Sequence, residues 1–197
     1  RHDGLKDTHW ITLTGRAVKK LKGELSCQEG FEAIKSEFQR AAQLAVENPN
    51  AGTFFQQEKE SLASDRQDGW REVELFRRGY ELKHCGLFPS TCEVARQLPE
   101  ASKFFGSIKF STIAPGTNVR PHFALANDHL RLYLGVVVPE PDLVDLWIGD
   151  ARHGWNEGKV IAIDDSVVHS AHHRGTLNHT VLIVDILHPN HPEPFEV

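Results

Sequence analysis

The stretch that decides the fold runs from Val119 to Gly135 and reads V-R-P-H-F-A-L-A-N-D-H-L-R-L-Y-L-G. In it His122 follows a proline, and a polar turn separates it from an apolar strand that carries one cation, Arg131. A second histidine, His169, stands in the later segment I-D-D-S-V-V-H-S. Two imidazoles on well-separated strands, with a strand-borne arginine between them, indicate a non-haem iron site that also holds an acidic co-substrate.

The sequence around this stretch consists of short apolar segments separated by turns. Seven of them lie within about 80 residues, and they cover 107–113, 119–123, 129–138, 143–148, 159–163, 167–171 and 179–187. Segments this short and this evenly spaced predict a two-sheet jelly roll or barrel. We therefore expect a mainly β fold, a cupin-like double-stranded β-helix.

The N-terminal part of the chain has a different pattern. Apolar residues recur at helical spacing between Ser26 and Asn48, and they predict one helix with a single buried stripe. We expect a single oxygenase domain, in which residues 1–65 form a helical and irregular buttress, 66–190 the β core and 191–197 a tail. The helices are expected to support the core and to carry no function.

Composition limits the classes of partner. The chain has 197 residues and a net charge of −5, which is no electrostatic footprint for nucleic acid. It has no run of 18 apolar residues, so we expect no membrane contact. It begins at Arg1 and contains no Met, so we expect that an upstream segment, with any targeting information, has been removed.

Two of the three cysteines frame a turn-rich loop. Cys85 and Cys92 stand on either side of G-L-F-P-S-T. They form either a disulfide or two unpaired thiols, and spacing alone does not decide between these. The compartment stays open as well: cytoplasmic, or luminal if Cys85 and Cys92 are bonded.

Several motifs together resemble the aspartyl/asparaginyl beta-hydroxylase family, a branch of the Fe(II)/2-oxoglutarate oxygenases. The matching segments are 106–122, 130–139, 155–160, 164–169 and 184–189, and upstream G-W-R-E-V-E-L-F at 69–76 and the C-x6-C pair. The resemblance implies a double-stranded β-helix that hydroxylates an unactivated C–H bond. It also implies Fe(II), 2-oxoglutarate and O2 as cofactor and co-substrates.

The resemblance implies a metal site with two histidines. His122 and His169 are the expected ligands, and Ala124 occupies the position where most such oxygenases have a carboxylate ligand. Asp165 matches an acid that bonds to metal-bound water. The alternative is that both histidines are ordinary core residues.

The expected co-substrate residues match the family only in part. Ser111 and Arg131 match positions that contact 2-oxoglutarate, whereas Tyr133 replaces a histidine and His179 replaces the arginine that holds the distal carboxylate. Arg174 is a further cation for that role. Because an imidazole titrates near neutrality, we expect a His179 clamp to weaken as pH rises from about 6 to 8.

The substrate is not determined by the sequence. Trp70 and Arg66 lie at or near substrate-contact positions of the family, and Trp70 is alternatively a core aromatic. We expect hydroxylation of the β-carbon of an amino acid or of an Asp or Asn residue, with an amino acid, peptide or small molecule as partner. The alternatives are another oxidation on the same scaffold (halogenation, cyclisation or desaturation) and a metal-binding module without turnover.

Overall fold

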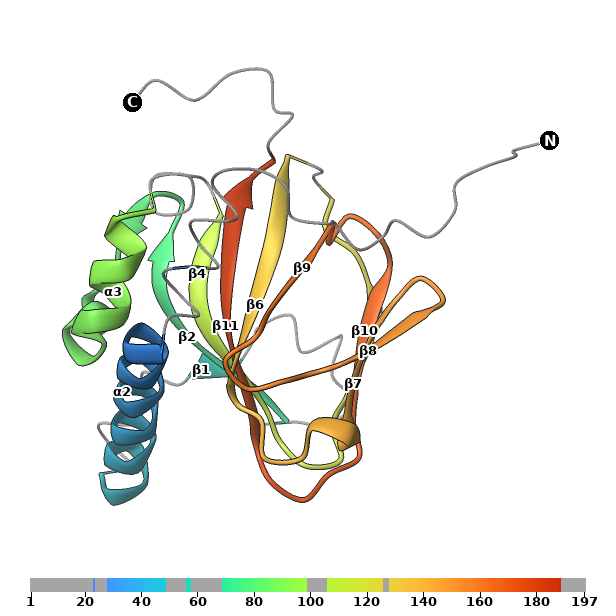
Figure 1. Ribbon diagram of the computed structural model, residues 1–197, viewed down its shortest axis with the longest axis horizontal. Helices are drawn as coiled ribbons and strands as arrows, with labels where there is room; N and C mark the ends of the chain where they lie inside the picture. The colour runs from blue at the N-terminus through green and yellow to red at the C-terminus, as the bar shows by residue number, and fades with distance from the viewer. Residues whose placement is uncertain are drawn as a thin grey trace.

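The computed structural model describes residues 23, 28–48, 56–57, 69–98, 106–125 and 128–188. Within these ranges the fold is mainly β, with two α-helices against one side (Figure 1). The elements are α2 (Gln28–Glu47), β1 (Gln56–Gln57), β2 (Trp70–Arg77), β3 (Tyr80–Glu81), η2 (Lys83–Leu87), α3 (Pro89–Arg96), β4 (Ser107–Ile113), β5 (Asn118–His122), β6 (His129–Val137), η3 (Pro141–Leu143), β7 (Val144–Ile148), β8 (Ala151–Gly154), β9 (Val160–Ile163), β10 (His169–His173) and β11 (His179–Leu187).

The strands form two antiparallel sheets. The larger, seven-stranded sheet has the order β1-β2-β4-β11-β6-β9, with β3 paired to β2, and the smaller sheet has the order β5-β10-β7-β8. The chain passes between the two sheets several times, so neighbouring strands are mostly distant in sequence. This arrangement is the double-stranded β-helix that the turn-separated segments predicted.

The two faces of the larger sheet have different roles. Side chains alternate between the faces of a strand, so every second residue points to the same side. On the outer face, Phe110 and Leu182 belong to an apolar cluster that includes Phe31 and Phe38 of α2. Residues on the inner face point into the space between the sheets, and the functional candidates lie there.

Helix α2 agrees with the predicted helix over 26–48, and its predicted stripe is buried at Phe31, Ile34, Phe38 and Ala41. Ser26 lies outside the described residues. One charged residue, Glu37, is also buried. Its carboxylate caps helix α3.

Helix α3 begins at Pro89 and is fixed to α2 by a carboxylate. The backbone N–H groups of Ser90 and Thr91 donate to Glu37 at 2.6 and 2.9 Å, and the Thr91 hydroxyl donates at 2.7 Å. The first N–H groups of a helix have no partner inside the helix, so Glu37 satisfies groups that would otherwise be buried unpaired. The open question about Cys85 and Cys92 is also resolved, because the structure joins them in a disulfide that links η2 to α3.

A close backbone crossing positions the turn after β8. A Cβ added at Gly135 would lie 2.5 Å from the carbonyl oxygen of Asn156, so only glycine fits there. Gly135 also accepts a hydrogen bond from Gly158 N–H and donates one to the Lys159 carbonyl. These bonds hold the 155–158 turn against β6, and Trp155 at its start is turned into the core.

Among the helices that the structure describes, none combines the length and apolar character needed to cross a bilayer.

Candidate metal and co-substrate site

The inner faces of the two sheets enclose a cavity of about 860 Å³. Eight of the residues singled out from the sequence line it: Trp70, Ser111, His122, Arg131, Tyr133, Asp165, His169 and His179. They come from β2, β4, β5, β6, β10, β11 and the loop after β9, and the strand pairing brings them together.

His122 and His169 form a cross-strand pair. Their Cα atoms are partners in the antiparallel β5–β10 ladder, and their ring centroids are 4.2 Å apart. Each Nδ1 lies beside a backbone carbonyl two residues earlier, at 2.8 Å from Arg120 O and 2.9 Å from Val167 O. A carbonyl accepts only, so each Nδ1 carries a proton and Nε2 is the ring nitrogen left to bind a metal.

These two rings fit a metal ion. His169 Nε2 is buried and has no hydrogen-bond partner among the described residues. Burial lowers the pKa of His169 to about 4, so the ring is neutral at neutral pH, which is the form that binds metals. A backbone carbonyl that fixes the orientation of a ligand imidazole is a regular feature of metal sites.

Ala124 also lines the cavity, two residues after His122. Its backbone N–H donates to the Asp165 carbonyl at 2.8 Å, which ties the segment after β5 to the loop that carries Asp165. Its methyl side chain cannot bind a metal. At this position the chain therefore offers no carboxylate to accompany the two histidines.

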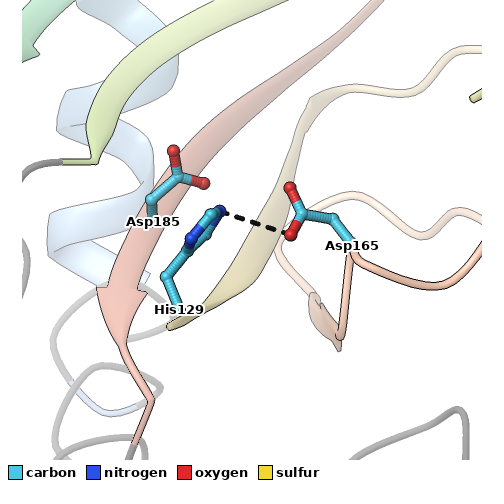
Figure 2. A group of neighbouring side chains, drawn as sticks. All are labelled: His129, Asp165 and Asp185. Carbon is cyan, nitrogen blue, oxygen red and sulfur yellow. Dashed lines mark ion pairs between the residues drawn. The ribbon is translucent and has the colours of Figure 1, made fainter. Parts of the chain in front are cut away.

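Arg131, His129, Asp165 and Asp185 line the cavity and form a charge cluster, of which Figure 2 shows the last three. Arg131 donates to Asp185 through Nε at 2.7 Å and Nη2 at 3.1 Å, and its Nη1 lies 3.1 Å from Asp165. His129 Nε2 lies 3.3 Å from Asp165. The bond to Asp165 raises the pKa of His129 to about 9, while His129 and Arg131 hold the pKa of the buried Asp165 carboxyl below its usual value.

His129, Asp165 and Asp185 offer metal-ligand atoms within 4.8 Å of one another. Two cations already compensate the two carboxylates, because Arg131 bonds both and His129 is protonated at neutral pH. A divalent ion here would have to displace a proton and face a guanidinium. The His122–His169 pair is the better metal site on this ground.

The co-substrate candidates Ser111 and Tyr133 differ in their surroundings. Trp70 Nε1 donates to Ser111 Oγ at 2.8 Å, so Trp70 is held over the cavity 6.2 Å from the His122 ring. Tyr133 is buried, which raises its pKa to about 12, and its ring meets Trp155 edge-on at 5.3 Å. Both hydroxyls are therefore neutral and suited to bind by hydrogen bonds.

His179 is more deeply buried than the sequence suggested. Its side chain lies 5.1 Å from the Trp155 ring and 6.4 Å from the His173 ring. Burial, assisted by His173, lowers its pKa to about 3. The expected titration of His179 between pH 6 and 8 is therefore corrected for the protein alone: in the folded chain this imidazole is neutral over that whole range.

The structure places Arg174 away from the cavity. Arg174 is half-exposed and pairs with Asp145 at 2.8 Å, and its side chain is not part of the cavity wall. The expectation that Arg174 contacts the co-substrate is therefore corrected. Asp145, which also pairs with Arg152, holds the Arg174 side chain outside the cavity. Arg66 lies outside the described residues.

Three functional candidates in the cavity wall were not singled out from the sequence: His129, Asp185 and Trp155. His129 and Asp185 had a signal. His129 is two residues before Arg131 on the same strand face, and Asp185 is a lone charge within the apolar run V-L-I-V-D-I-L. Trp155 had none, because a tryptophan at a turn is equally expected in a core.

The fold and cavity define a class, the double-stranded β-helix proteins with a histidine-lined site between two sheets. The solved prolyl-4-hydroxylase from Pseudomonas putida shares this fold, with a TM-score of 0.50 and 10% identity over 80% of this chain and 88% of that one. At this low identity the likeness describes the fold alone.

The chain belongs to the aspartyl/asparaginyl beta-hydroxylase family, whose sequence profile matches residues 28–189. Human aspartyl/asparaginyl beta-hydroxylase is 31% identical over 190 residues, which are 95% of this chain and 24% of that protein. The ornithine lipid ester-linked acyl 2-hydroxylase of Rhizobium tropici is 27% identical over 82% of this chain and 56% of that protein. The chain thus spans about a quarter of the length of its human relative.

Proposed function

We propose that this chain is an Fe(II)- and 2-oxoglutarate-dependent oxygenase that hydroxylates the β-carbon of an amino acid or of an Asp or Asn residue. The observation that carries the proposal is the cross-strand pair His122–His169, with both Nδ1 atoms beside carbonyls and the Nε2 atom of His169 buried without a partner. Family membership and the name of the human relative support the reaction and the substrate class.

His122 and His169 would hold the metal through Nε2. Bound Fe(II) would supply the activation of O2, one oxygen atom of which enters the C–H bond while the other oxidises the 2-oxo acid as CO2 leaves. With only two protein ligands, more of the metal's coordination positions are left to the co-substrate, water and oxygen than in a site with three.

The chain's own residues orient the reactants. Ser111 accepts the Trp70 N–H, so its hydroxyl hydrogen would be available to donate to a ligand in the cavity. The Trp70 ring lies 6.2 Å from the His122 ring, so it would contact a substrate bound next to the metal. The cluster around Arg131 pairs the buried carboxylates with cations, and it keeps the loop that carries Asp165 and leads to His169 in place.

The proposal is tested first by metal binding. His122→Ala and His169→Ala should each lower Fe(II) affinity by at least about tenfold, because a two-ligand site has no spare donor. His172→Ala is the matched control, since His172 lies on β10 but bonds Asn118 and is not part of the cavity wall. Affinity would be measured anaerobically by calorimetry, and unchanged binding in both variants rejects the site.

The second test is turnover. Iron-loaded protein with 2-oxoglutarate, O2 and Asp- or Asn-containing peptides should convert 2-oxoglutarate and add one oxygen atom to the peptide, detected by mass spectrometry. A product that requires chloride would identify halogenation. Iron binding without consumption of 2-oxoglutarate would identify a binding module.

A further inference from the structure

One part of the cavity wall holds two buried polar side chains, Trp155 and His179, whose ring nitrogens have no hydrogen-bond partner among the described residues. Trp155 is 4% exposed and His179 is 2% exposed, and their rings lie 5.1 Å apart. Neither Trp155 Nε1 nor either ring nitrogen of His179 has a hydrogen-bond partner among the described residues. Leaving such groups unpaired is costly, so each requires an explanation.

Their neighbours cannot satisfy them. The His173 ring is already bonded, because its Nε2 lies 2.7 Å from the Leu177 carbonyl and its Nδ1 accepts the Gly175 N–H. Tyr133 presents its ring to Trp155 edge-on. Both side chains, Trp155 and His179, line the cavity, so a ligand bound in this part of the cavity would lie next to them.

No fixed cation stands in this part of the cavity among the described residues. Of the cavity's cations, Arg131 bonds Asp185 and Lys109 bonds Glu72 at 2.6 Å. Asp185 is six residues from His179 along β11, which is about 20 Å at the rise of a strand. The Arg131 side chain therefore cannot span that distance.

Two further arginines of the cavity wall, Arg77 and Arg78, lie at the opposite end of β2. Arg77 pairs with Glu74, and Arg78 occupies the turn to β3. Trp70 lies at the other end of the same strand. It pairs with Ile113 of β4, and Ile113 pairs on its other side with His179 of β11. An anionic group brought beside His179 thus meets donors and no permanent positive charge.

Burying a carboxylate without a compensating charge is strongly unfavourable, and a proton is the simplest compensation. We propose that the His179–Trp155 part of the cavity binds the far carboxyl group of a 2-oxo dicarboxylic acid together with one proton, with Trp155 Nε1–H and the His179 ring as its hydrogen-bond partners. The inference rests on the proposed function and adds Trp155 as a residue that determines co-substrate specificity. The proton is shared between imidazole and carboxyl, where the family uses a permanently charged arginine.

The groups that face His179 support this assignment. The nearest titratable group on β10 is His173, and both nitrogens of its ring are hydrogen-bonded. The nearest titratable group on β6 is Tyr133, whose pKa lies far above neutrality. Facing it from β4 is the apolar Ile113. His179 itself is the group that can take up a proton when an anion arrives.

The test is calorimetric binding of 2-oxoglutarate to the Mn(II)-loaded protein without O2, at pH 6, 7 and 8. Two buffers with different protonation enthalpies report the protons taken up, and preloaded metal prevents His122 and His169 from contributing. We expect an uptake of about one proton and a Kd that weakens by about tenfold per pH unit below the pKa of the bound state. The probe 2-oxopentanoate, with a methyl in place of the far carboxylate, should bind with no uptake.

Variants identify the groups. Trp155→Phe should weaken 2-oxoglutarate binding by about tenfold or more, the usual effect of a bond to a charged group. Trp147→Phe is its control, because Trp147 is not in the cavity wall. His179→Gln should abolish proton uptake, His179→Arg should abolish it and tighten binding, and His172→Gln should behave as the parent.

The outcomes separate the two proposals. A parent that binds 2-oxoglutarate with no proton uptake and a flat pH profile overturns this inference while the proposed function stands. Equal effects of Trp155→Phe and Trp147→Phe remove Trp155 from the site. A parent that does not bind 2-oxoglutarate at all overturns the proposed co-substrate, and this inference with it.

Discussion

Replacing Arg131 with methionine should destabilise the protein strongly and in a pH-dependent way. Arg131 makes two bonds to Asp185 and one contact to Asp165, and both carboxylates are at most 2% exposed. Methionine keeps much of the apolar volume and removes the charge. Among the described residues, His129 remains as the cation that contacts the cluster shown in Figure 2, and Lys109 on β4 also acts on Asp185.

The expected loss is about 3–5 kcal/mol at pH 7.5, the usual cost of leaving one buried charge without its partner. It is not larger, because protonated His129 still compensates one of the two carboxylates. A loss of this size is a large fraction of the stability of a typical domain.

The pH dependence follows from the carboxylates. In the parent the pKa values of Asp165 and Asp185 are lowered, so their contribution to stability is present above about pH 4 and is lost as pH falls through the folded values. Without Arg131 burial dominates and their pKa values rise, so the folded variant binds a proton more readily as pH falls. The difference in unfolding free energy should therefore be smaller at pH 5 than at pH 7.5.

Equilibrium urea unfolding, followed by tryptophan fluorescence at both pH values, measures this difference. The control is Arg152→Met, since Arg152 is half-exposed and its partner Asp145 keeps Arg174. That control should lose at most about 1 kcal/mol. If Arg131→Met loses no more than Arg152→Met at pH 7.5, or if its loss does not shrink at pH 5, the account of the buried cluster is wrong.

Two further predictions concern the metal and the helices. Ala124→Asp should raise metal affinity by supplying a carboxylate two residues after His122, measured by anaerobic calorimetry; no change would mean that this side chain does not face the metal. Glu37→Gln should lower the unfolding free energy by about 1–3 kcal/mol, because the first N–H groups of α3 lose a charged acceptor. Glu47→Gln, at the exposed end of α2, is its control in the same urea unfolding assay and should change stability by less than about 0.5 kcal/mol.

The sequence by itself determined the fold class and the pair of histidines. Period-2 apolar segments with turns at short spacing leave few architectures other than two packed sheets, and the helical stripe of α2 is buried as the spacing required. These features are local, because they depend on which face of each element is apolar. The motifs around His122 and His169 can be recognised in the same way, because each is a short run of consecutive residues.

Only the tertiary structure decided which charges meet and which remain free. Arg131 looked like a cation available to a ligand, and the pairing of β6 with β11 placed Asp185 directly beside it. Arg174 is close to His179 in sequence, but it follows the end of β10 and pairs with Asp145 outside the cavity. Partners of this kind come from strands that are distant in the chain, so no local pattern records them.

Burial decided the ionisation of the site for the same reason. His179 has the reference pKa of any histidine in the sequence, and enclosure by Trp155 and the strands around it lowers that pKa to about 3. Gly135 holds the turn that supplies Trp155. Only the tertiary structure shows why this residue is a glycine, because a side chain there would collide with the Asn156 backbone. Residue type and spacing thus determine which elements form, and desolvation and long-range pairing determine what their side chains can do.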